Sequence, residues 1–304
     1  MKKFKKILGG FSIYSITFIS SFLILLILLV IMINIIRGGW SNLTWEFLTT
    51  PPREGMTAGG IFPAIFGTFF LVIIMSILSV PIGIISAIYL SEYASSGSIF
   101  VKLIRFAINT LAGVPSIVFG LFGLGFFIQF VGKGLDSVLY GNAILKWGQP
   151  NVLWAGTTLA LLTLPVVVVS VEEAIRAVPR DLREASLSLG ATKWQTIKKI
   201  VIPNSLTGIL TGTILAVSRG AGEVAPILFT GAAYFLPYLP SSLSDQFMNL
   251  GYHIYIMSTQ SPNVEETIGI QYATTLVLLL LTFTLNFTAI FLRYKVREKL
   301  RTGR

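Results

Sequence analysis

Long apolar runs, separated by short polar stretches, dominate the pattern of this chain. Five runs contain no Asp, Glu, Lys or Arg, and they cover residues 11–36, 61–90, 106–131, 152–171 and 267–292. A sixth run, 204–236, carries Arg219 and Glu223 as its only charges. Because a helix needs about 20 predominantly apolar residues to cross a bilayer, the pattern predicts six transmembrane helices.

The composition supports an all-α integral membrane protein. Of the 304 residues, 54% are hydrophobic and 12% are charged, and the mean hydropathy is +0.79. Soluble domains carry about 25% charged residues, so these values exclude an ordinary soluble enzyme. No repeat or low-complexity linker divides the chain, and we expect one membrane domain over 1–304. Three expected helices contain a proline at which we expect a kink or a break, namely Pro81, Pro115 and Pro165.

The sequence gives no indication of a metal site or a hydrolase site. There is no cysteine, which excludes disulfides and thiolate ligands. The single histidine, His253, lies in an expected outer connection, where we expect a hydrogen-bonded side chain rather than a metal ligand. The acids Glu172 and Glu173 follow the fourth run, and we expect them on a solvated face beside basic residues. No acidic pair has the context of a glycosidase or protease site.

Lysine and arginine are distributed unevenly between the two sides of the expected membrane. The net charge is +10, and 18 of the 23 basic residues fall on one side if the N-terminus is cytoplasmic. Because basic residues accumulate on the cytoplasmic side, we expect both termini and the segment 177–203 to be cytoplasmic. The positive charge therefore indicates orientation in a lipid bilayer and not a nucleic-acid partner.

The segment 177–203 contains the pattern of two short helices. Asp181 and Glu184 fit the first turn of a helix that begins after Pro179 and ends at Gly190. A second helix is expected over 191–200. Pro203 then suits the start of the following helix. The local pattern alone favours an ordinary basic loop between two membrane helices.

The spacing within this segment is more specific than its local pattern. Glu184 and Ala185 are followed by Gly190, and later by Ile200 and Pro203. These residues resemble the EAA motif in permease subunits of ABC importers, which implies a six-helix, MetI-like permease architecture. In that family the first helix of the motif sits in a groove of a cytoplasmic ATPase and transmits its closure to the membrane helices. The resemblance therefore implies that these five residues couple the chain to an ATPase.

The charges of the sixth apolar run are the candidate substrate site. Arg219 and Glu223 are one helical turn apart and can pair, although a charge near the bilayer centre costs about 2.5–3.5 kcal/mol on insertion scales. One hypothesis is a structural ion pair that joins helices. The other is that the guanidinium of Arg219 binds a crossing oxyanion, while Glu223 prevents the anion from binding too tightly. Gly220 and Gly222 would loosen the helix and free backbone N–H groups for the anion.

Small residues supply the remaining candidates. Ser116 follows a Gly-Val-Pro sequence in the third run, and we include it in the hypothetical substrate path, although packing alone explains such residues as well. Small residues also recur every four positions in the sixth run and predict a close helix contact, at Gly208, Gly212, Ala216 and Gly220.

The chain lacks a phosphate-binding loop of the Gly-x-x-x-x-Gly-Lys-Ser/Thr type. Its only Gly-Lys pair, at Gly132, is followed by Gly134 and has Phe127 where the first glycine belongs. We therefore expect no bound cofactor and no enzymatic activity in this chain. A partner subunit would bind the ATP.

Further stretches are similar to the PstA-type permease subunits of bacterial phosphate-specific ABC importers. They are 59–63, 111–120, 161–165, 219–226 and 260–263. The resemblance covers the chain from the second span onward. It implies a bacterial inner-membrane protein that imports phosphate with a related PstC-type permease, two copies of a cytoplasmic ATPase and an external phosphate-binding protein.

Other functions remain open from the residues alone. Sulfate or molybdate would suit the same arginine, and phosphate rests on the resemblance. A passive anion channel would use Arg219 for selectivity, but a channel has no need of an ATPase-docking helix. An intramembrane hydrolase would need a nucleophile and a base at membrane depth, and the apolar runs contain no His, Cys or paired Asp.

Overall fold

The computed structural model describes residues 2–95, 97–141, 143–261 and 264–302, and within these ranges the side chains of 14–298. Pro262 and Asn263 of the last similar stretch, and Arg304 of the basic tail, lie outside the described residues. The α-helices are α1 (Lys2–Gly39), α2 (Trp45–Thr49), α3 (Phe62–Ile88), α4 (Ile99–Ala112), α5 (Ser116–Phe122), α6 (Lys133–Tyr140), α7 (Val152–Arg176), α8 (Arg180–Ser188), α9 (Lys193–Thr196), α10 (Ile202–Ala221), α11 (Leu250–Thr259) and α12 (Val264–Thr302).

Short elements of other types join these helices. The 3-10 turn η1 (Trp40–Asn42) precedes α2. After α2 comes a hairpin of β1 (Pro52–Arg53) and β2 (Ala58–Gly59), in which Pro52 pairs with Gly59. A second 3-10 turn, η2 (Glu54–Met56), joins the two strands. Three π-helical stretches continue helices, namely η3 (Tyr89–Tyr93), η4 (Gly123–Gly132) and η5 (Ile197–Val201).

Six helical stretches among the described residues are long and apolar enough to cross a membrane. They are Tyr14–Asn42, Phe62–Tyr93, Ser116–Tyr140, Val152–Arg176, Lys193–Ala221 and Val264–Glu298. The predicted all-α fold with six spans is thus confirmed. The helix α7 lies at the centre and packs most extensively against α3 and α10. Buried Val167, Val171 and Ile209 belong to the core that these helices share near α8.

The third span differs from its predicted range of 106–131. A helix begins earlier, as α4 at Ile99, and it stops at Gly113, after which Pro115 precedes a new helix. This helix runs through α5, η4 and α6 to Tyr140. The break has the expected cause, because proline disfavours helical backbone in the residue before it. By contrast, α3 and α7 continue through Pro81 and Pro165.

The fifth span also differs from its predicted range of 204–236. The helix begins at Lys193 and ends at Ala221, and the chain from 222 to 249 has no regular helix. The predicted span was too long because the irregular segment after Ala221 is itself apolar and buried, for example at Ile227 and Leu236. The apolar residues of this segment therefore indicate burial and not a helix.

The segment 222–249 satisfies the free end of α7. The first N–H groups of a helix have no partner within it. In α7, Val152 N–H donates to the carbonyl of Asp245 (2.9 Å), and the side chain of the N-cap residue Asn151 accepts from Trp154 N–H (2.9 Å). Irregular backbone within a membrane protein is tolerated where its polar groups are paired in this way.

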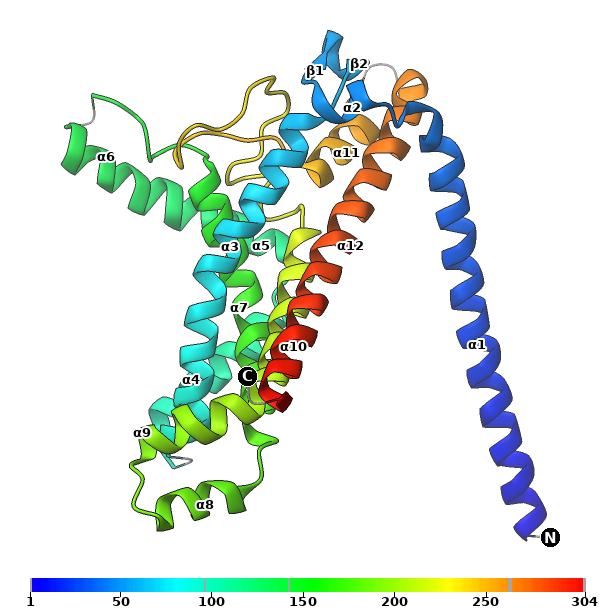
Figure 1. The fold of residues 1–304 in the computed structure, drawn as a ribbon. Coiled ribbons are helices and arrows are strands. Elements are labelled where there is room, and N and C mark those ends of the chain that lie inside the picture. Colours follow the sequence, from blue (N-terminus) through cyan, green and yellow to red (C-terminus); the bar gives the residue numbers. More distant parts are fainter. Residues whose placement is uncertain (1, 96, 142, 262–263, 303–304) are drawn as a thin grey trace.

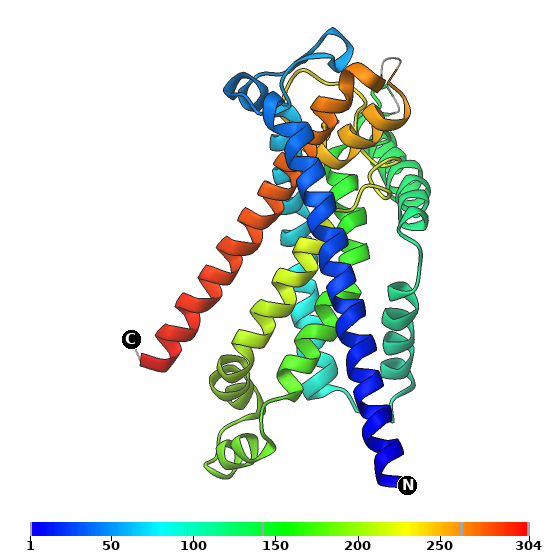
Figure 2. The same cartoon turned by 90° about the vertical axis from the view of Figure 1, so that its right-hand side faces the viewer.

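Figure 1 shows α8 and α9 at one end of the molecule and the hairpin, α2 and α11 at the other. The N-terminal end of α1 and the C-terminal end of α12 both point toward the end that carries α8, as Figures 1 and 2 show. The helix α1 meets α12 near Gly38 and Tyr272 and diverges from the bundle below this contact. The assignment of the α8 end to the cytoplasm stays a prediction.

Candidate functional site

The candidate residues form two separate regions. Glu184, Ala185 and Gly190 lie on or just after α8, at one end of the molecule. Arg219 and Glu223, with their neighbours, lie where α10 ends, toward the middle of the bundle. Ile200 and Pro203 occupy η5 and the start of α10, between the two regions along the chain.

The helix α8 ends where the glycine was predicted to end it. Gly190 has a φ of +84°, a left-handed conformation that glycine adopts without a steric penalty. Its N–H donates to the carbonyl of Leu187 (2.9 Å), and Ala191 N–H donates to that of Ser186 (3.2 Å). These two hydrogen bonds form a Schellman motif, which satisfies the last carbonyls of the helix.

The second predicted helix merges with the fifth span. Thr192 caps it, because its hydroxyl accepts from Gln195 N–H while the Gln195 side chain accepts from Thr192 N–H (2.8 Å). From Lys193 the helix continues through η5 into α10, so Pro203 does not begin a separate helix. The wide turn of η5 precedes this proline, whose ring cannot supply the N–H of a regular turn.

No residue of α8 is buried. Leu182, Ala185 and Leu189 are exposed at spacings of three and four residues, which places them on one helical face. Glu184 beside them is exposed as well, and Trp194 of α9 is 55% exposed. The segment thus presents an apolar face, formed by Leu182, Ala185 and Leu189, that the described part of the chain leaves uncovered.

Two ion-pair networks near α8 were not predicted. Glu172 is only 7% exposed and pairs with Arg105 of α4 (2.7 Å) and Arg176 (2.6 Å). The expectation that both acids lie on a solvated face is therefore wrong for Glu172, whereas Glu173 is exposed. Glu172 is buried because Arg105 reaches across from α4 to neutralise it.

The second network joins α8 to other helices through Arg183. Its side chain pairs with Glu92 at the end of η3 (3.0 Å) and donates to the Ile175 carbonyl of α7 (2.8 Å). Arg183 sits one position before the motif that the sequence analysis identified. In the sequence, this ion pair is indicated only by a lone acid, Glu92, which lies just after the uncharged run 61–90.

At the end of α10 the two charges are only loosely paired. Arg219 Nε lies 4.0 Å from Glu223 Oε1, and the side chains are 64% and 22% exposed. The expected free N–H groups are not found, because Gly222 N–H donates to the Arg219 carbonyl (3.2 Å) and Glu223 N–H to that of Gly220 (3.2 Å). A helix C-terminus leaves carbonyls without partners, not N–H groups, so an anion here would depend on side-chain donors.

The helix α10 has a buried side and an exposed side. Gly212, Ala216 and Gly220 of the small-residue stripe are buried, and a Cβ on Gly220 would lie 2.4 Å from Sδ of Met75 in α3. Gly208 of the same stripe also approaches α7 closely, because a Cβ there would lie 2.6 Å from Cβ of Ala174. The exposed side carries Asn204, Leu215, Arg219 and Gly222 at helical spacing. Arg219 thus lies on a side of α10 that the chain's own helices do not cover.

Ser116 lies in the same sector of the molecule. It opens α5, and one turn later a Cβ on Gly120 would lie 3.0 Å from the carbonyl oxygen of Pro226. The turn after Ser116 therefore packs against the segment that follows Glu223. The candidate residues Arg219, Gly220, Gly222 and Glu223 lie within five positions of one another, and the helix that Ser116 begins contacts the segment directly after them.

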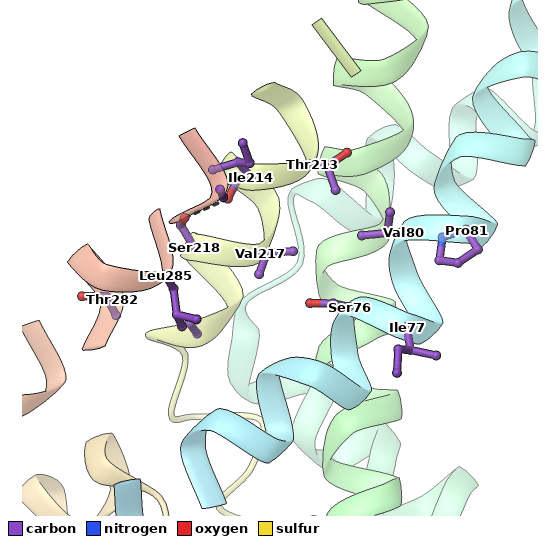
Figure 3. A pocket seen from close by; sticks show the side chains of 12 residues that line it. Ser76, Ile77, Val80, Pro81, Thr213, Ile214, Val217, Ser218, Thr282 and Leu285 are labelled. Carbon is purple, nitrogen blue, oxygen red and sulfur yellow. Dashed lines mark hydrogen bonds between the residues drawn. The ribbon is translucent and has the colours of Figure 1, made fainter. Parts of the chain in front are cut away.

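A cavity of about 370 Å³ lies on a third side of α10, between α3, α10 and α12. Figure 3 shows Ile77, Val80, Val217 and Leu285 along its wall, and Ser218 bonded to the Ile214 carbonyl. Its lining contains no charged residue. Such a lining is unsuited to an oxyanion, because a desolvated charge needs a partner, so this cavity is not the candidate substrate path.

His253 lies apart from both regions, in α11. Its side chain is 2% exposed, and its Nδ1 has no hydrogen-bond partner among the described residues. Burial lowers the pKa of His253 from 6.5 to about 4, so the ring is neutral at physiological pH.

Permease proteins of other bacteria are similar in sequence to most of this chain. The probable ABC transporter permease protein YqgI of Bacillus subtilis is 32% identical over 277 residues, 88% of each chain. The phosphate transport system permease protein PstA 1 of Mycobacterium tuberculosis is 32% identical over 291 residues, 93% of this chain and 87% of the relative.

Solved ABC transporters share the fold. A chain of a bacterial alginate ABC transporter, solved with an alginate-bound periplasmic protein, covers 94% of both chains with a TM-score of 0.67 and 17% identity. A chain of the MetNI methionine ABC transporter covers 77% of this chain and 94% of its own, with a TM-score of 0.54 and 18% identity. The expected MetI-like architecture is thereby confirmed.

A family model matches residues 79–302, from the second half of α3 to the end of α12. This range includes both candidate regions. The family is described as the inner membrane component of binding-protein-dependent transport systems. Together with the relatives, this match confirms the resemblance to importer permeases. The chain belongs to the family of inner membrane components of binding-protein-dependent transport systems, and it is a multi-pass transport protein.

Proposed function

We propose that this chain is a permease subunit of an ATP-driven importer of inorganic phosphate. It would form the translocation path with a PstC-type permease, receive phosphate from an external binding protein, and couple to a dimeric cytoplasmic ATPase. ATP would be bound by the ATPase and not by this chain. Several relatives are phosphate transport permeases by name, which supports phosphate as the substrate.

The observation that carries the proposal is the exposure of Arg219 on a membrane helix. An arginine at membrane depth faces a water-filled path or another protein, because contact with lipid is unfavourable. Its side chain is 64% exposed and lies 4.0 Å from its nearest acid. Its planar donors therefore remain available for the oxygens of a phosphate. A second permease facing this side of α10 would enclose the path.

The exposed surface of α8 favours an importer over a passive channel. Leu182 and Ala185 lie in a helix without any buried residue, and Leu189 follows directly after it on the same face. Apolar side chains at an aqueous surface favour a protein partner. An ATPase groove would cover them, and closure of the groove would then move the membrane helices that follow α8. Glu184, Ala185 and Gly190 would position this contact, and Ile200 and Pro203 would continue it into α10.

Uptake of labelled anions into vesicles tests the proposal. The chain, the partner permease, the ATPase and the binding protein are reconstituted together, and phosphate, sulfate and molybdate are compared with and without ATP. We expect uptake of phosphate that depends on ATP. A preference for sulfate or molybdate would overturn the substrate, and equal uptake without ATP would indicate a channel.

Two variants test the role of Arg219 in the same vesicles. We expect Arg219→Ala to lower phosphate uptake by about tenfold, the loss of roughly one charge-assisted hydrogen bond. Arg219→Lys keeps the charge but loses the planar donors, so it should be intermediate. Full uptake in both variants would reject a role for Arg219 in the path.

A further inference from the structure

The helix α8 takes no part in the buried apolar clusters that join the membrane helices. It contains no buried residue. A cavity of about 640 Å³ separates it from the ends of α3 and α7, and Glu92, Arg176, Arg183 and Leu187 are among the residues that line it. Movement of α8 therefore cannot reach α3 or α7 through close apolar packing at this point.

One side chain crosses this space. Arg183 donates from Nη2 (3.0 Å) and Nε (3.2 Å) to the same carboxylate oxygen of Glu92. Both side chains are largely shielded from water, with 18% and 11% of their surfaces exposed. Shielding strengthens an ion pair relative to one at the surface. The link connects α8 to η3, which directly continues α3.

The same guanidinium also holds the end of α7. It donates to the carbonyl of Ile175 in the last turn of α7 (2.8 Å), and to the carbonyls of Val178 and, at longer range, Pro179 (3.4 Å) in the connection that follows. The last carbonyls of a helix have no partner within it, and a cation near them is stabilised by the helix dipole. A planar guanidinium can bind a carboxylate and these carbonyls at once, which the single ammonium of a lysine cannot.

The other contacts around α8 do not provide this connection. Ser186 bonds to Thr196 (2.9 Å), which joins α8 to α9 only. Lys193 of α9 lies 5.0 Å from the ring centre of Tyr93, a cation–π contact at an exposed site. Arg183 is thus the described residue of α8 for which direct bonds to both α7 and the end of α3 are observed.

We propose that Arg183 is a positioning residue that transmits movement of α8 to α3 and α7 through its link to Glu92 and its hydrogen bond to the Ile175 carbonyl of α7. This inference rests on the proposed function, because it assumes that an ATPase moves α8. Since α7 packs against both α3 and α10, a displacement at Arg183 reaches the helix that carries Arg219.

The ratio of phosphate transported to ATP hydrolysed tests the link in the complete reconstituted assembly. We expect Arg183→Gln and Glu92→Gln each to lower this ratio about fivefold or more, the lower range of a typical coupling between two sites. The double variant should lose no more than either single variant, because both remove one interaction. Arg183→Lys should not restore the ratio, since one ammonium cannot replace the fork.

Arg176→Gln is the matched control. It removes an equal charge from the same cavity, but Arg176 pairs with Glu172 within α7. The ratio should stay near that of the wild type. An unchanged ratio in Arg183→Gln, additive losses in the double variant, or loss of the ATPase from the purified Arg183→Gln assembly would each overturn the inference. A wild-type assembly without ATP-dependent uptake would instead refute the proposed function.

A distance measurement tests the same link without transport. The chain has no cysteine, so spin labels can be placed at Ser188→Cys in α8 and Ser95→Cys after η3, which are both exposed. With Arg183 present, we expect a narrow distance distribution that is the same before and after ATP is trapped. Arg183→Gln should broaden it. Equal widths with and without Arg183 would contradict the link.

Discussion

The coupling segment around α8 and the end of α10 use the same residue types in opposite ways. Gly190, directly after α8, has open space where a Cβ would be, and it is required because its φ is positive. Gly220 is required because a Cβ there would clash with α3 and α7. Arg183 is engaged by a carboxylate and carbonyls, whereas Arg219 is exposed and loosely paired. An arginine that holds structure is thus distinguished from one that is free to bind by its partners, not by its position in the motif.

The largest expected effect is on the coupling segment. Gly190→Pro cannot adopt the positive φ and removes the N–H that caps α8, a cost of about 3 kcal/mol or more to the local helix. We expect phosphate uptake in reconstituted vesicles to fall at least about tenfold, while membrane insertion stays normal. Gly190→Asn is the control, because asparagine tolerates the left-handed conformation. Normal uptake in Gly190→Pro would contradict the role of α8.

The second prediction concerns the close contact at the end of α10. In Gly220→Val, a Cβ would lie 2.4 Å from Met75 Sδ and 2.8 Å from Thr163 Cγ2. We expect a loss of stability of about 1–3 kcal/mol, seen as a lower thermal unfolding midpoint in detergent. Gly222→Val is the matched variant, because the nearest atom there is 3.8 Å away. Equal midpoints for the two variants would show that the contact is not close.

His253 lies in α11, at the end of the molecule opposite α8, and we expect it to make the stability of the chain sensitive to acid. Its pKa in the folded chain, about 4, lies below the unfolded value of 6.5. The unfolded chain therefore binds a proton first, and stability is lost as the pH falls from 6.5 toward 4. The expected loss at pH 5 is about 2 kcal/mol. Unfolding midpoints at pH 7.5 and 5 measure it, and His253→Leu should abolish this part of the dependence. An unchanged slope in that variant would refute the assignment.

The smallest expected effect separates the two hypotheses for Arg219. Because Arg219 and Glu223 are loosely paired and Arg219 is exposed, Glu223→Gln should change the unfolding free energy by less than about 0.5 kcal/mol. A structural ion pair that joins helices would instead show a loss of several kcal/mol. Thermal unfolding gives the answer, and phosphate uptake in the same preparation shows whether Glu223 affects release of the anion.

The sequence was sufficient for the fold but not for the contacts that make it work. Six spans, the end of α8 at Gly190 and the break at Pro115 follow from hydropathy and backbone rules. The end of α10 at Ala221 did not follow, because the buried segment after it is as apolar as a helix. The ion pairs of Glu172 with Arg105 and of Arg183 with Glu92 were not predicted, because the partners lie on other helices and are distant in sequence.

The most direct test measures ATP hydrolysis and phosphate uptake side by side for Gly190→Pro and Arg219→Ala in the complete assembly. The account predicts that Gly190→Pro loses the stimulation of ATP hydrolysis by the phosphate-loaded binding protein together with uptake. Arg219→Ala should keep the stimulation and lose uptake. If both variants lose stimulation and uptake to the same extent, the division between a coupling region and a substrate path is contradicted.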